Sequence, residues 1–141
     1  MATAASALIN SSTPVCSSAI LATANPNRDG TGANAQVFAF PSPGSVGGRC
    51  DWIRIQALAA TTAGMIRLFV MNPAGAFFMI AEIPVAAVTP SASAPAFSAD
   101  YFPPYNSAIN QSQLIAGPNF RLYASTENAE PFAVTAFGAN M

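Results

Sequence analysis

The sequence has no histidine and no lysine, and only 8% of its 141 residues are charged, against about 25% in an ordinary soluble domain. Without histidine, the chain lacks the usual general base of nucleophilic triads and the commonest metal ligand. A net charge of −1 leaves little basic surface for phosphate or anionic lipid. These absences argue against an enzyme, a metal or other cofactor, and direct contact with nucleic acid or a membrane.

Long apolar runs are also absent. Residues 1–27 carry no charged side chain, but Asn, Ser, Thr and Pro interrupt them and no basic residue comes before the apolar positions. The uncharged stretch 101–120 contains three prolines and therefore cannot be one helix. We expect no membrane span and no export signal, and a protein that is made and used in a cytoplasm.

Only two cysteines are present, Cys16 and Cys50, and they do not form a CxxC motif. Two thiols at this spacing favour an interpretation as small reduced side chains, but the sequence leaves open whether they pair.

What the chain does have is 52% apolar residues, with 12 prolines and nine glycines between short runs of Ile, Val, Phe and Thr. This pattern is typical of many short strands and turns, and no apolar stripe of period 3.6 continues over the length of a helix. We predict an all-β fold, a β-sandwich or jelly-roll-like domain at residues 49–141 with an extended N-terminal arm at residues 1–48. Removal of residues 1–34 is then expected to leave the hairpins of residues 50–138 folded.

The alternation in residues 51–58 predicts a strand with one apolar face. That face holds Ile53, Ile55 and Ala57, and the other holds Trp52, Arg54 and Gln56.

Residues 65–71 and 76–83 flank Asn72-Pro73-Ala74-Gly75, which suits a type I turn and predicts a hairpin. Pairing Met71 with Ala76 places Arg67, Phe69, Phe78 and Ile80 on one face. An outer face with this apolar character needs a cover, from this chain or from a neighbour, so we expect an oligomer even for the isolated protein. A last hairpin is predicted from residues 119–125 and 131–138.

Two groups of residues suggest other chemistry. Glu127 and Glu130 are the nearest pair of acids for a glycosidase, although two acids on a loop are more often a solvated turn. Trp52, Tyr101 and Tyr105 would form the stacking platform of a carbohydrate-binding module, a hypothesis weakened by the missing export signal.

Residues 54–97, RIQALAATTAGMIRLFVMNPAGAFFMIAEIPVAAVTPSASAPAF, and the ending FRLYASTENAEPFAVTAFGANM resemble small virion structural proteins encoded in the head-gene region of tailed bacteriophages. The resemblance rests on TTAG followed by IRLF and later EIPV. It implies a non-enzymatic β-rich protein, with a capsid decoration (cement) protein as the leading hypothesis. A tail, baseplate or fibre component is the alternative within the virion.

A cement protein would bind the major capsid protein on the virion surface as a homo-oligomer, with a trimer as the expectation, and would be assembled in the host cytoplasm. Its contacts are predicted from the strand-forming positions of the arm, the outer hairpin face and two anchor side chains. These residues are Ile20, Leu21, Val37, Phe38, Phe40, Trp52, Arg54, Phe69, Phe78 and Ile80.

Overall fold

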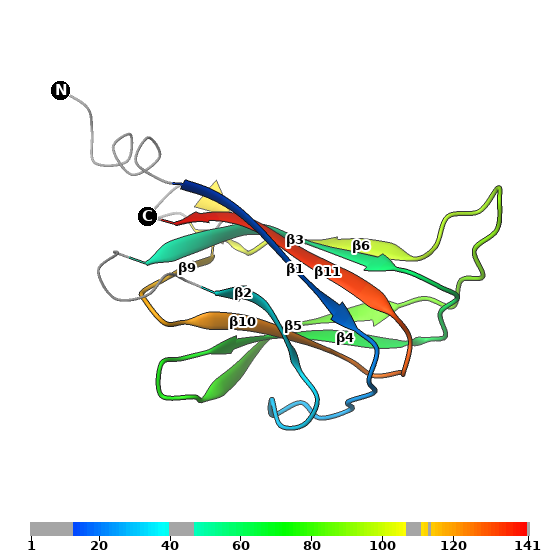
Figure 1. Ribbon diagram of the computed structural model, residues 1–141, viewed down its shortest axis with the longest axis horizontal. Helices are drawn as coiled ribbons and strands as arrows, with labels where there is room; N and C mark the ends of the chain where they lie inside the picture. Colours follow the sequence, from blue (N-terminus) through cyan, green and yellow to red (C-terminus); the bar gives the residue numbers. More distant parts are fainter. Residues whose placement is uncertain (1–12, 40–46, 107–110, 113, 141) are drawn as a thin grey trace.

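The computed structural model describes residues 13–39, 47–106, 111–112 and 114–140. They form a β-sandwich of two packed antiparallel sheets, which confirms the predicted fold class (Figure 1). Sheet A has the strand order β1–β11–β3–β6, and β9 also pairs with β3. Its strands are β1 (Thr13–Leu21), β11 (Phe132–Asn140), β3 (Gly48–Ala57), β6 (Ser98–Tyr101) and β9 (Leu114–Ala116).

Sheet B has the order β2–β10–β4–β5. Its strands are β2 (Ala35–Ala39), β10 (Arg121–Thr126), β4 (Gly64–Met71) and β5 (Phe77–Val85). A short ribbon of β7 (Tyr105–Asn106) and β8 (Gln111–Ser112) completes the described strands.

The core lies between the inner faces of the two sheets. The predicted apolar face of β3 is buried there, since Ile53, Ile55 and Ala57 are at most 3% exposed. Leu122 of β10 and Val134 of β11 meet this face from the two sheets. The period-2 alternation of the sequence therefore identified the inner side of these strands correctly.

The predicted hairpin of residues 119–138 is wrong. β10 pairs with β2 and β4 in sheet B, whereas β11 pairs with β1 and β3 in sheet A. The segment 127–131 crosses from one sheet to the other. Both strands have the expected apolar sides, but these sides face each other across the core because two alternating strands satisfy either arrangement equally well.

The β4–β5 hairpin forms with a different register from the predicted one. The backbone N–H of Asn72 donates a hydrogen bond to the backbone carbonyl of Ala76 at 3.0 Å, and Gly75 adopts a φ of 87°. The hairpin loop therefore has three residues. Met71 therefore pairs with Phe77, and a bulge after Leu68 shifts the pairing again. Arg67 consequently faces Glu82 directly.

This register also corrects the predicted outer face. Phe78 pairs with Val70, so it lies on the opposite face from Phe69. Ile80 packs against the core cluster instead of standing on the outer face. Of the three apolar residues expected there, only Phe69 is on the outer side of sheet B, and it is fully buried.

The cover over Phe69 comes from this chain. The loop of residues 22–34 joins β1 to β2 and lies over the outer face of sheet B (Figure 1). Below it, the Phe77 ring meets Phe69 and Tyr123 edge to face, at centroid distances of 6.3 and 5.2 Å. Gly30 sits so close to Phe77 that a Cβ on Gly30 would lie 2.3 Å from the Phe77 Cβ. We name residues 22–34 the covering loop.

The first 48 residues are not a separate arm in the part that the structure describes. β1 pairs with β11 over nine residues, and β2 pairs with β10. Leu21, Val37 and Phe38 are buried in the common core. The predicted boundary at residue 48 therefore needs correction, because residues 13–39 supply one edge strand and core side chains to each sheet. Residues 1–12 lie outside the described residues.

Two glycine substitutions test how tightly the covering loop packs against sheet B. Gly30 and Gly75 both have positive φ, but only Gly30 is crowded, since nothing lies within 4 Å of a Cβ on Gly75. We expect Gly75→Ala to lower the free energy of unfolding by about 1 kcal/mol through backbone strain alone. Gly30→Ala should lose about 2 kcal/mol more because Phe77 must move. Urea unfolding of both variants measures the difference, and equal losses would show that the loop is not tightly seated.

Candidate protein-docking surface

An aromatic row crosses the outer face of sheet A. Trp52 of β3 pairs with Phe137 of β11, and their rings stack with centroids 4.5 Å apart and planes 16° apart. On the other side of Trp52, Phe102 follows directly after β6, and its ring is nearly parallel to the indole at 6.2 Å. Phe102 is 63% exposed. We name these three residues the aromatic row.

One ion pair stands beside the row. Arg54 Nη1 donates to both carboxylate oxygens of Asp100, at 3.0 and 2.9 Å, and the Trp52 Nε1 donates to Asp100 Oδ1 at 3.0 Å. The hydrogen bond from Arg54, with that from Trp52, holds the pKa of Asp100 below its ordinary value. The carboxylate therefore neutralises the arginine and also fixes the indole in the row.

Arg49 and Asp51 of β3 form a second ion pair on this face, at 3.1 Å, and the neighbouring lines of the sheet are mostly neutral. The register places Ser18 of β1, Thr135 of β11 and Arg54 side by side in one line across the sheet. In the next line Ile20 pairs with Ala133, which pairs with Gln56. An outer sheet face with three aromatic rings and two self-neutralised ion pairs suits contact with another protein surface, where aromatic side chains and arginine carry most of the binding energy.

A sugar-binding platform does not fit this geometry. Phe102 and Phe137 flank Trp52 with nearly parallel rings, and the Phe137 ring stacks on the indole at 4.5 Å. Tyr101 pairs with Ile53 and packs against the core, which places it on the opposite side of sheet A. The side chain of Tyr105 lies outside the described residues. The proposed platform is therefore not assembled by the described residues.

The residues predicted for an interface fall into three groups. Leu21, Val37, Phe38 and Phe69 are buried within the chain, so they cannot serve as exposed contacts. Trp52, Arg54 and Ile20 lie on the outer face of sheet A. Phe78 is exposed on sheet B, whereas Ile80 packs against the core. Phe40 lies outside the described residues.

Sequence reasoning missed Phe102, Phe137 and Asp100. Phe137 could have been found from the sequence, because it is a large apolar residue at an odd-numbered position of a strand whose apolar core face is formed by even-numbered residues. Nothing in the sequence placed Phe102 beside Trp52, because the pairing of β6 with β3 joins distant segments.

A buried ion cluster lies under the covering loop, on the other side of the molecule. Arg67 is 1% exposed, and its Nε and Nη2 donate to Glu82 at 2.9 Å and to Glu127 at 2.5 Å. Its Nη1 reaches the carbonyl of Asn25 at 3.4 Å, and Arg28 bonds Glu82 at 2.6 Å. The cluster thus ties the covering loop, β5 and the segment after β10 to β4.

The pKa values of this cluster follow from the same contacts. Burial alone lowers the pKa of Arg67, but hydrogen bonds to Glu127 and Glu82 outweigh it and raise that pKa. Hydrogen bonds from Arg28 and Arg67 lower the pKa of Glu82. Arg67 and Glu82 therefore stay charged near neutral pH.

The two acids considered as a glycosidase pair have separate structural contacts. Glu127 binds Arg67, whereas Glu130 Oε1 accepts hydrogen bonds from the amide and hydroxyl of Thr62 at 2.8 and 2.6 Å. The solvated-turn interpretation is thus also incomplete, because both acids fasten the 127–131 crossing to the β3–β4 side of the molecule.

Cys16 and Cys50 are free and cannot pair in this fold. They lie on strands at either side of β11, where Cys16 faces outward beside Phe137 and Cys50 is buried in the core. Burial raises the pKa of the Cys50 thiol to about 12, so this thiol is unreactive near neutral pH.

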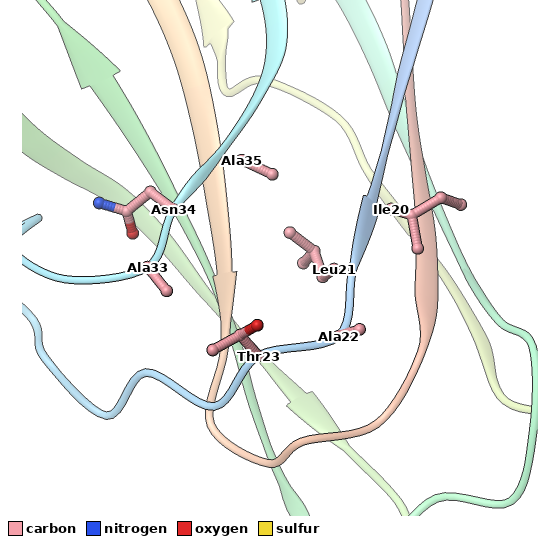
Figure 2. A pocket seen from close by; sticks show the side chains of 7 residues that line it. All are labelled: Ile20, Leu21, Ala22, Thr23, Ala33, Asn34 and Ala35. Carbon is pink, nitrogen blue, oxygen red and sulfur yellow. The ribbon is translucent and has the colours of Figure 1, made fainter.

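A small pocket opens between the end of β1 and the start of β2 (Figure 2). Residues 20–23 and 33–35 line it, and none of them is titratable. Its volume of about 140 Å³ is below the roughly 300 Å³ at which ligand pockets begin. In Figure 2, Leu21 points toward β2 while Ile20 points away from the pocket. The pocket suits one inserted side chain better than a substrate.

Among residues 13–39, 47–106, 111–112 and 114–140, no three His, Cys, Asp or Glu side chains gather where they would hold a metal ion. The same residues include no helix that is long and apolar enough to cross a bilayer.

Comparison with protein-family models gives no match, and comparison with curated proteins gives no significant relative. The resemblance to virion proteins therefore stays a prediction.

Proposed function

We propose that this chain is a non-enzymatic structural protein of a virion, a capsid decoration (cement) protein that attaches to the major capsid protein through the outer face of sheet A. The observation that carries the proposal is the aromatic row with the self-neutralised Arg54–Asp100 ion pair on the outer face of sheet A. The choice of the major capsid protein as the partner rests on the resemblance of residues 54–97 to virion proteins encoded in the head-gene region.

The mechanism of attachment is burial of aromatic and small neutral side chains. Phe102 is 63% exposed and would enter a hollow of the capsid surface, with the stacked rings of Trp52 and Phe137 beside it. Because the Arg54 charge is already paired, docking requires little additional desolvation of an isolated charge. Such an interface depends only weakly on salt, in contrast to binding of nucleic acid.

The trimer is not part of this proposal. An oligomer was expected because the outer hairpin face needed a cover, and the covering loop of the same chain supplies that cover. The trimer implied by the resemblance stays a prediction.

Two exposed phenylalanines allow a matched test. Phe102 on sheet A is 63% exposed and Phe78 on sheet B is 56% exposed, so replacing either by aspartate should change the free energy of unfolding by less than about 0.5 kcal/mol. We expect Phe102→Asp to weaken binding to undecorated capsids by about 30-fold or more, and Phe78→Asp to leave it unchanged. Co-sedimentation with capsids measures both, and the heat resistance of the particles gives a second readout.

Unchanged binding of the Phe102 variant would contradict the docking face, and equal loss in both variants would show that the contact is not confined to sheet A. Binding of the wild-type protein to purified tails and not to capsids would overturn the assignment to the head.

A further inference from the structure

The free edge of sheet A at β1 is long, regular and uncharged. β1 pairs with β11 from Thr13–Asn140 to Leu21–Phe132 without a register shift. Among the described residues, no strand lies on its other side. Along an antiparallel strand, about half of the backbone N–H and C=O groups point away from its one neighbour, so this edge is a template for a further strand.

The other described edges are shorter or interrupted. β5 carries a bulge opposite Leu68 and Phe69 and a proline, Pro84, and β2 has only five residues and its own register shift. On the far side of sheet A, β3 is shared by β6 and β9, which have four and three residues. Such features are the ones by which sheets prevent edge pairing. In β1, the only feature of this kind is Pro14, the second residue of the strand.

We propose that β1 pairs antiparallel with β1 of a second copy of this chain, about a twofold axis at Ser18. This register uses residues 15–21 and leaves Pro14 outside the paired segment. It sets Val15 opposite Leu21 of the partner subunit and Cys16 opposite Ile20 of the partner subunit, with Ser17 opposite the partner's Ala19. The two copies of sheet A then form one continuous sheet.

The occupant is a second copy because the segment is complementary to itself. Its apolar residues stand at both ends and its small residues in the middle, so reversal about Ser18 matches apolar with apolar and small with small. It contains no charge, so two copies bring no like charges together. Ile20, which is 59% exposed on a strand edge, gains a direct apolar partner. The proposal does not depend on capsid binding.

Paired charges at positions 16 and 20 test the register. Within one chain these residues are about 13 Å apart, so they interact only across the proposed contact. We expect the wild-type protein to be a dimer in light scattering at tens of micromolar. The variant with Cys16→Glu and Ile20→Glu places like charges opposite each other twice, and its dissociation constant should rise by about 100-fold or more. The variant with Cys16→Glu and Ile20→Lys places opposite charges there and should be a dimer again.

Both variants alter exposed positions, and circular dichroism verifies that they fold. A wild-type monomer, a dimer or trimer that persists with two glutamates, or a folded Glu/Lys variant that stays monomeric would each overturn the proposal. As an independent measurement, Ile20→Cys should allow a short bis-maleimide to link Cys16 to the new cysteine of the second copy in high yield. The control Ala74→Cys, at the exposed β4–β5 turn, should not increase linking, and equal yields in both variants would likewise overturn it.

Discussion

Deletion of residues 1–34 is expected to abolish cooperative folding. The deletion removes all of β1, which pairs with nine residues of β11, and the whole covering loop with its buried Asn25. It also removes Leu21 from the core and exposes the edge of β11. Since a domain of this size is stable by only about 5–15 kcal/mol, the loss of one strand and its core contacts exceeds what the remainder can sustain. Thermal unfolding followed by circular dichroism should show no transition.

A point substitution provides the graded control for this deletion. Phe38 of β2 is fully buried, and Phe38→Ala should lower the free energy of unfolding by about 3–5 kcal/mol while leaving a folded protein at low temperature. A truncated protein that kept the wild-type β-sheet spectrum and a cooperative transition would show that residues 13–34 are dispensable for the sandwich.

Replacement of Arg67 by alanine is expected to cost about 3–5 kcal/mol, the usual loss when one partner of a buried ion pair is removed. The substitution leaves a cavity under the covering loop, and it removes the donors to Glu82, Glu127 and the carbonyl of Asn25. Urea unfolding at pH 7 measures the loss.

Arg67→Met is the matched control, because it keeps most of the side-chain volume and removes only the charge and the hydrogen bonds. The two acids are partly exposed and can be hydrated, so we expect this variant to lose clearly less than Arg67→Ala. A loss below about 1 kcal/mol for Arg67→Ala would mean that the cluster does not hold the covering loop in place.

Local pattern was sufficient to predict the long strands β3, β4, β5, β10 and β11, but not the short strands β6 to β9 and not how the strands pair. The alternation in residues 51–58 gave the correct inner face, because side chains of a strand alternate whatever the neighbouring strand is. The pairing of residues 119–125 with 131–138 was wrong because the same alternation fits a crossing between sheets. The predicted β4–β5 register was wrong for two reasons. The left-handed Gly75 adds a residue to the loop, and the bulge after Leu68 adds an unpaired residue within β5.

The candidate docking surface was predictable only in part. Trp52 and Arg54 were identified from the polar side of one strand, but Phe102 and Phe137 come from segments that meet Trp52 only when sheet A assembles. The predicted arm at residues 1–48 and the predicted outer hairpin face also misled the prediction of exposed contacts. Phe38 and Phe69 looked available for a partner, whereas tertiary packing within the chain buries both of them.

The pairing of β1 with β11 affects how the protein folds during its synthesis on the ribosome. β1 ends at Leu21, and its only described neighbour in sheet A begins at Phe132. During synthesis β1 therefore has no partner strand until nearly the whole sandwich has been made. Contacts between such distant segments make folding slow. During that interval the uncharged segment 15–21 is exposed and can pair with the same segment of another nascent chain. Rapid synthesis on crowded polysomes should therefore favour insoluble protein, and a lower growth temperature should increase the soluble yield.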